Sequence, residues 1–156
     1  MILAFYEFVR CADDIADHPT LGAADSLLGD NALTSLTPLV NLRSLHLTST
    51  LVQGPGLAAI SGLTNLRELN LDGAPLGNEG MEHVAKTYGL ETLSLRYTNL
   101  TDPAMEQIGK LKNLRRLDLS SVDVTEKGLM SLVGMNNLVD LDLSFARFAA
   151  PPSAAR

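Results

Sequence analysis

The chain has 156 residues, of which 46% are apolar and only 4% aromatic, so it is long enough to bury one aliphatic core. The net charge of −6 gathers at the N-terminus, where residues 1–30 carry six acids and one base, and no basic face suits nucleic acid. No run of about twenty apolar residues could cross a membrane. The single cysteine, Cys11, excludes an internal disulfide framework and fits a reducing, cytoplasmic setting.

The first expected element is an amphipathic helix over residues 1–19. Pro19 ends the helix, and its apolar residues fall largely on one face. These residues are Ile2, Phe5, Phe8, Val9, Ala12 and Ile15. Such a helix can cover the open edge of a repeat stack. A fused fragment of another protein is the alternative, because three acids near a helix C-terminus oppose the helix dipole.

The string FYEFVRCADDIADHP in this helix resembles the first aspartate-rich segment of the squalene and phytoene synthase family. The matching residues are Tyr6, Arg10, Asp13, Asp14 and Asp17. The resemblance implies that Asp13 and Asp17, four residues apart on one helix face, hold Mg²⁺ against a prenyl diphosphate. That family also needs a second aspartate-rich helix, and none follows Asp17. We therefore expect no catalysis, metal or cofactor, and keep a fragment or fusion remnant of such a Mg²⁺-dependent synthase as the alternative function.

Leucines recur every 24 residues in the rest of the chain, in units of the form L-x-x-L-x-L. Each unit but the last continues with a turn and an apolar helical stretch, and a weaker unit over residues 21–36 keeps the same register. The three leucine series are Leu42, Leu66, Leu90, Leu114 and Leu138; Leu45, Leu69, Leu93, Leu117 and Leu141; and Leu47, Leu71, Leu95, Leu119 and Leu143. One such unit cannot bury its own leucines, so the units are expected to stack.

This pattern resembles the leucine-rich repeat family over residues 21–148. The resemblance implies an α/β solenoid with a curved parallel sheet on the concave side and short helices on the convex side. The alternation of leucine with polar residues over 44–48 agrees with a strand that has one buried face. We expect the repeat array over 20–148, the helix over 1–19 and a disordered tail over 149–156. Because the last unit has no return helix, we expect residue 156 to be a boundary inside, or at the ragged end of, a longer array. The alternative is that residues 146–148 form a short closing edge.

The segments that return from one strand to the next are expected to begin with helix caps. Short polar side chains precede them, at Asp30, at Asn78, at Thr101 with Asp102, and at Thr125. Pro55 and Pro103 suit a first helical turn, where a missing N–H costs little.

Alternate strand residues remain on the concave face, where a partner could bind. Asp118 and Asp142 fall on successive rungs about 4.8 Å apart, so an Arg or Lys of a partner would relieve their repulsion. Tyr97 and Phe145 supply the aromatic surface that interface hot spots favour. The candidate partner-binding residues are Arg96, Tyr97, Arg116, Asp118, Asp140, Asp142 and Phe145. The other interpretation is a solvated face with in-sheet pairs, such as Arg116 with Asp140 or Asp142.

The sequence therefore favours a non-enzymatic scaffold for protein–protein interaction. We expect a protein partner, whose identity the sequence does not give, and neither nucleic acid nor a membrane. A structural repeat module with no partner is the third hypothesis. No histidine pairs with Cys11 or another histidine at metal-ligand spacing, and no phosphate-binding glycine loop occurs.

Overall fold

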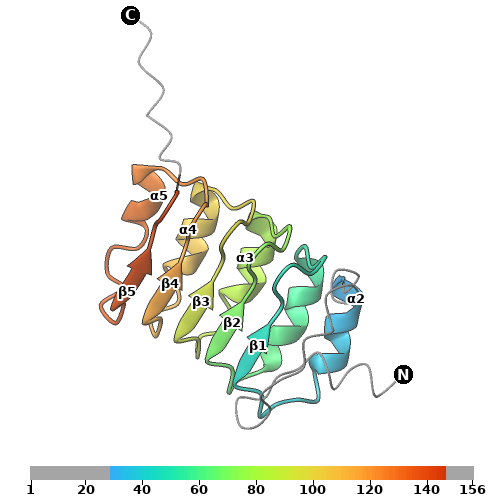
Figure 1. Cartoon of the computed structure of the whole chain (residues 1–156). Helices are drawn as coiled ribbons and strands as arrows, with labels where there is room; N and C mark the ends of the chain where they lie inside the picture. The colour runs from blue at the N-terminus through green and yellow to red at the C-terminus, as the bar shows by residue number, and fades with distance from the viewer. Residues whose placement is uncertain (1–28, 147–156) are drawn as a thin grey trace, which may run out of the picture.

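The computed structural model describes residues 29–146 (Figure 1). The helix expected over 1–19, with Asp13 and Asp17, and the tail expected over 149–156 lie outside the described residues.

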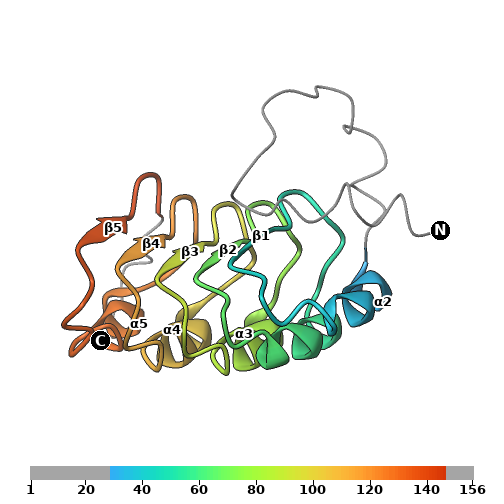
Figure 2. The same ribbon diagram turned by 90° about the horizontal axis from the view of Figure 1, so that it is seen from below.

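Strands and short helices alternate along the described part of the chain. In order they are α2 (Asp30–Leu33), η2 (Thr34–Leu36), β1 (Ser44–His46), η3 (Pro55–Gly62), β2 (Glu68–Asn70), α3 (Asn78–Val84), β3 (Thr92–Ser94), α4 (Asp102–Ile108), β4 (Arg116–Asp118), α5 (Glu126–Met130) and β5 (Asp140–Asp142). The strands stand side by side as one layer and the helices line its other side (Figure 2). One strand with its return segment is one coil of the stack.

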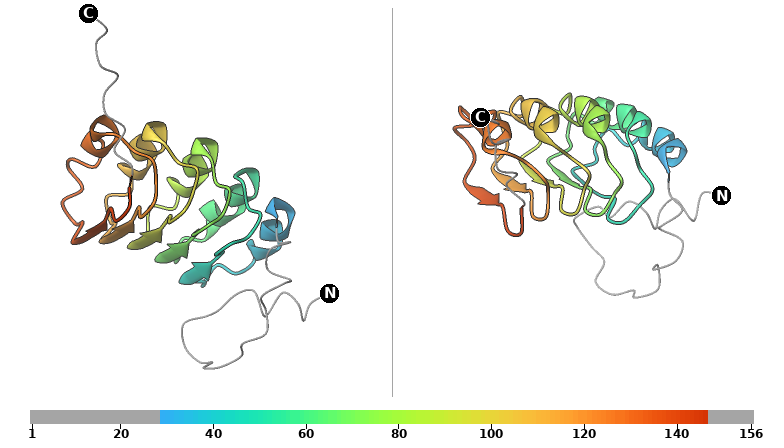
Figure 3. Two further views of the ribbon diagram at one scale, coloured as in Figure 1. Left: turned by 45° about the horizontal axis from the view of Figure 1, so that its top comes forward. Right: turned by 90° about the horizontal axis from the view of Figure 1, so that it is seen from above.

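The sheet is parallel and its register follows the 24-residue period. Within residues 29–146 it has five strands in the order β1-β2-β3-β4-β5. Each strand residue pairs with the residue 24 positions later, as in Leu45↔Leu69 and Leu93↔Leu117. Because strands that follow each other in sequence are paired in parallel, the chain must return to the start of the next strand, and it does so through the helical layer, as Figure 3 shows from two sides. The predicted leucine-rich solenoid is confirmed.

The core lies between the sheet and the helices and is almost wholly aliphatic. The spine leucines from Leu45 to Leu117 are 0–2% exposed. Met81, Val84 and Met105 close the core from the helical side. Two buried threonines, Thr50 and Thr98, donate their hydroxyls to the carbonyls of Leu47 and Leu95 at 2.8 and 2.6 Å. A threonine hydroxyl therefore holds this turn only in the coils whose sequence has a threonine at that position.

The predicted helix caps are wrong in their function, although Pro55 and Pro103 do stand in first turns. No side-chain cap hydrogen bond forms at the start of α2, α3, α4 or α5. Instead three of these side chains accept hydrogen bonds from backbone N–H groups of the following coil, which lie within reach once the coils stack. Asp30 Oδ1 accepts from Gln53 at 3.2 Å, Asn78 Oδ1 from Thr101 at 3.1 Å, and Asp102 Oδ1 from Thr125 at 2.8 Å. We call this series the coil ladder.

Candidate partner-binding face

The exposed side of the sheet, here called the concave face, carries the polar columns that the sequence predicts. Strand register places one column through Ser44, Glu68, Thr92, Arg116 and Asp140, and another through His46, Asn70, Ser94, Asp118 and Asp142. The leucines between these columns point the other way, into the core. The predicted order of residues along the face is therefore confirmed.

The aspartates at the ends of β4 and β5 each hold the turn that follows. Asp118 Oδ1 accepts the N–H of Ser120 at 2.9 Å, and Asp142 Oδ1 accepts that of Ser144 at 2.8 Å. Asn70 does the same on β2, accepting the N–H of Asp72 at 2.9 Å. Since one carboxylate oxygen makes this bond, the second oxygen of each aspartate remains for another contact.

Hydrogen bonds to the turn favour the charged form of Asp142. The hydroxyl and the backbone N–H of Ser144 lower the pKa of Asp142, because both hydrogen bonds favour the ionised carboxylate. Asp140 and Asp142 are both exposed, and within residues 29–146 neither forms an ion pair. The C-terminal end of the face is therefore acidic.

Arg96 links the aspartates to an aromatic ring. Its Nε lies 3.8 Å from Asp118 Oδ2, and its guanidinium carbon lies 5.6 Å from the centre of the Tyr97 ring. Hydrogen bonding with the Tyr97 side chain, and then the charge of Asp118, raises the pKa of Arg96. The backbone N–H of Arg96 also donates to Asp72 Oδ1 at 2.9 Å. Arg96, Tyr97 and Asp118 thus form one connected group on neighbouring strands.

Tyr97 and Phe145 lie at the turn that follows β3 and β5. They are 60% and 86% exposed, and their φ angles are +55° and +58°. Bulky L-residues rarely take this left-handed conformation. The predicted exposure of the two aromatic rings is confirmed, and their backbone conformation is a feature that sequence reasoning missed.

The predicted pairing of Arg116 is wrong. Within the described chain, Arg116 forms no ion pair with Asp140 or Asp142, although the register sets it beside Asp140. An exposed pair gains little over solvated charges, so the register alone does not bring these side chains together. Among residues 29–146 the ion pairs that do form are His46–Glu68, Arg67–Glu91 and Arg96–Asp118.

Sequence reasoning also missed a polar hollow at the other end of the strands. Its volume is about 310 Å³, and its lining is Arg67, Gly89, Glu91, Asn113, Arg115 and Asn137. Asparagines one coil apart donate to the preceding coil, as Asn113 does to the Tyr88 carbonyl at 2.9 Å. Gly89 interrupts this series, and the Arg67 guanidinium fills the space that a side chain there would take. The 24-residue spacing of these asparagines is the signal in the sequence from which their bonds to the preceding coil could have been predicted.

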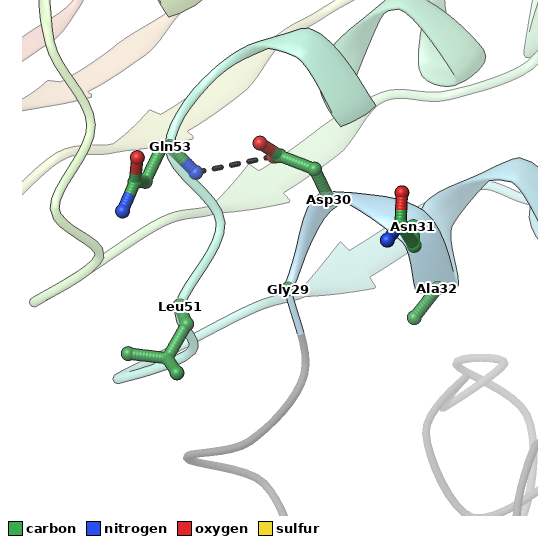
Figure 4. Close-up of a pocket in the computed structure, with 6 residues that line it drawn as sticks. All are labelled: Gly29, Asp30, Asn31, Ala32, Leu51 and Gln53. Atoms are coloured by element: carbon green, nitrogen blue, oxygen red, sulfur yellow. Dashed lines mark hydrogen bonds between the residues drawn. The ribbon is translucent and has the colours of Figure 1, made fainter.

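A second hollow opens beside the first described coil (Figure 4). It has a volume of about 580 Å³ and is lined by Gly29, Asp30, Asn31, Ala32, Leu51 and Gln53. Its one carboxylate, Asp30, is already bound to the N–H of Gln53. Among residues 29–146 there is no cluster of three or more His, Cys, Asp or Glu able to hold a metal ion.

No helix in the described residues is both long and apolar enough to cross a membrane.

Comparison with known proteins identifies the repeat and the fold. Residues 62–85 and 110–133 match a family model described as Leucine Rich repeat. An internalin from Listeria monocytogenes is similar in structure, with a TM-score of 0.63 and 19% identity over 75% of this chain and 33% of that one. Internalin C2 from the same organism has a TM-score of 0.62 and 22% identity over 76% of this chain and 49% of that one.

A plant structure is similar to a comparable extent. It is the leucine-rich repeat ectodomain of the Arabidopsis thaliana membrane receptor kinase GASSHO1/SCHENGEN3, in complex with CASPARIAN STRIP INTEGRITY FACTOR 2. The TM-score is 0.58 and the identity 22%, over 76% of this chain and 14% of that one. This chain thus spans less than half the length of each of the three structures. Comparison with curated protein sequences finds no match.

Proposed function

We infer that this chain, a leucine-rich repeat protein by its repeats and its fold, is a non-enzymatic scaffold that binds a protein partner on its concave face. One observation carries the inference: Arg96, Tyr97, Asp118, Asp142 and Phe145 gather on the last three strands and their turns, where none of them serves the core. The plant ectodomain, which is in complex with CASPARIAN STRIP INTEGRITY FACTOR 2, supports a binding function of this kind.

The chemistry of the face favours a basic partner segment. Asp140 and Asp142 are exposed carboxylates on β5, and Asp142 has an oxygen that the turn of Ser144 does not use. A Lys or Arg of the partner would reduce the repulsion between Asp142 and Asp118 on the neighbouring strand. Tyr97 and Phe145 beside them supply the apolar area on which a partner would anchor. We place the interaction in the cytoplasm, in keeping with the single Cys11.

The test removes charge without disturbing the turn. Asn70 stands in the same column as Asp118 and Asp142 and makes the same bond to the N–H two residues on. Asp118→Asn with Asp142→Asn should therefore keep the fold. Immobilised wild-type chain should enrich a defined set of proteins from an extract, and the double variant should lose that set. Glu82→Gln with Glu106→Gln, exposed acids on α3 and α4, is the matched control and should retain it. Equal enrichment by all three chains would overturn the proposal.

The synthase alternative is kept because of the aspartate string alone, since Asp13 and Asp17 lie outside the described residues. Farnesyl diphosphate and Mg²⁺ incubated with the purified chain test it directly. We expect no product. Product that disappears in Asp13→Asn would replace the scaffold with an enzyme.

A further inference from the structure

The turn after each strand requires a left-handed residue. Residues 49, 73, 97, 121 and 145 all have φ between +55° and +67°. Gly73 takes this conformation freely, and Ser49 and Ser121 carry small side chains there. A tyrosine or phenylalanine is costly at such a position, and residues held this way cluster at ligand-binding sites. Since Tyr97 and Phe145 are exposed, no gain in core packing offsets that cost.

The spacing of the two turns that carry the rings favours one kind of ligand. Tyr97 follows β3 and Phe145 follows β5, with the turn of Ser121 between them. Adjacent strands lie about 4.8 Å apart, so the two turns lie roughly 9.6 Å apart. In a polyproline II helix, residues i and i+3 share one edge at about 9.3 Å. Residues on one face of an extended β-strand repeat at about 6.8 Å and do not match. An α-helix comes near only with residues i and i+7, at about 10.5 Å.

The charges beside the rings agree with a proline-rich segment that has a basic flank. Arg96 is already held by Asp118 at 3.8 Å, whereas Asp140 and Asp142 have no basic neighbour within 4 Å in the described chain. A Lys or Arg next to the bound segment could reach these two carboxylates on β5. Aromatic side chains are a recurring platform for polyproline II ligands, which lose little conformational entropy on binding.

We propose that Tyr97 and Phe145 form a two-ring clamp for a polyproline II segment of the partner, with apolar residues at i and i+3 seated on the rings and a basic residue reaching Asp140 and Asp142. The clamp rests on the proposed function, because it specifies what the concave face binds. The segment would run across β3, β4 and β5 rather than along a strand.

The experiment uses labelled peptides and serine variants of the full chain. The probe is Lys-Pro-Leu-Pro-Pro-Leu-Pro-Pro-Lys, with its leucines three apart. Its control, Lys-Pro-Leu-Pro-Leu-Pro-Pro-Pro-Lys, has the same composition with leucines two apart. A helical peptide with leucines seven apart tests the competing spacing. Fluorescence anisotropy should show the probe binding about tenfold more tightly than either control.

Tyr97→Ser and Phe145→Ser are matched changes, because Ser49 and Ser121 already occupy the same turn with φ of +55° and +60°. Each should weaken binding of the probe about tenfold while the unfolding temperature stays the same or rises. Equal binding of the three peptides, or unchanged probe binding by both variants, would overturn the clamp. Loss of the partner in Asp118→Asn with Asp142→Asn but not in the serine variants would leave the proposed function standing without the clamp. Retention of the partner by every variant would remove both.

Discussion

The middle coils and the last described coil contain the same leucines in different surroundings. Leu93 on β3 is 1% exposed, whereas Leu141, in the same position on β5, is 40% exposed. Leu143 on that last coil is only partly buried, whereas Leu95 and Leu119 in the same position are 0% exposed. A leucine in this stack is therefore buried by the coil that follows it, so a coil's stability lies largely in its two interfaces.

The largest effect should come from deleting the same side chain in the two regions. Leu93→Ala should lower the free energy of unfolding by about 2–5 kcal/mol, because Leu93 is fully enclosed by the sheet and the helices. Leu141→Ala should cost roughly half of that or less, since water already reaches the side chain. Urea unfolding monitored by circular dichroism measures both. Equal losses would show that the last coil is as well packed as the middle ones.

A second effect tests how closely successive return segments approach. A Cβ at Gly56 in η3 would lie 2.5 Å from the Asp30 Cα of the preceding coil, a contact with backbone that cannot move aside. Gly56→Ala should therefore cost about 1–3 kcal/mol. Gly62, at the end of the same segment, has nothing within 4 Å of its Cβ position, so Gly62→Ala is the control and should be neutral or stabilising. The two variants make the same substitution at different places, and a similar cost at both would mean that the close approach of the return segments does not set the cost.

The sequence predicts the sheet well because its signal is global. A period of 24 repeated over five units determines which residues pair, which face water and which share a column, and the register confirms all three. The candidate residues on the concave face follow from that register. What sequence reasoning missed depends on contacts between coils. An aspartate at a helix start looks like a cap for its own helix. Asp102 instead accepts a hydrogen bond from the N–H of Thr125, which stacking of the coils brings within reach.

The left-handed turns could not be predicted for a similar reason. Of the five residues in this turn position only Gly73 has the usual sequence signal for positive φ, while Tyr97 and Phe145 argue against it. The stack imposes this conformation, because the N–H of Tyr97 donates to the carbonyl of Ser120 on the next coil, as Ser49 does to Asp72. Because the same kind of backbone bond forms at each internal turn, the type of side chain has little influence on the φ angle there.

A third prediction concerns a flaw inside a middle coil. Thr87 is 3% exposed, and its hydroxyl has no hydrogen-bond partner among residues 29–146, whereas the equivalent positions 63 and 111 hold buried leucines. Thr87→Val should raise the free energy of unfolding by about 1 kcal/mol, because a buried unsatisfied hydroxyl is removed. Thr98→Val is the control, since the Thr98 hydroxyl donates to Leu95 at 2.6 Å, and should lower stability by about as much. The same sign for both would show that hydrogen-bond satisfaction does not set these differences.

The smallest effect compares Asp102, a member of the coil ladder, with Glu126, which holds the equivalent position on α5. The hydroxyl and N–H of Thr125 lower the pKa of Asp102 below 3.8, so this carboxylate stabilises the folded chain fully above its unfolded pKa. That contribution is lost as pH falls from the unfolded pKa through the folded one. Asp102→Asn keeps the acceptor, as Asn78 does for Thr101, and should make unfolding less dependent on pH between about 5 and 2.

Glu126 holds the equivalent place on α5 but makes no hydrogen bond or ion pair with residues 29–146. Glu126→Gln should therefore leave the wild-type pH dependence unchanged, and urea unfolding at pH 5 and pH 2.5 compares the three chains. If Asp102→Asn were as sensitive to acid as the wild type, ionisation of Asp102 would not contribute to the pH dependence of stability. The middle and last coils would then differ only in how far their leucines are covered.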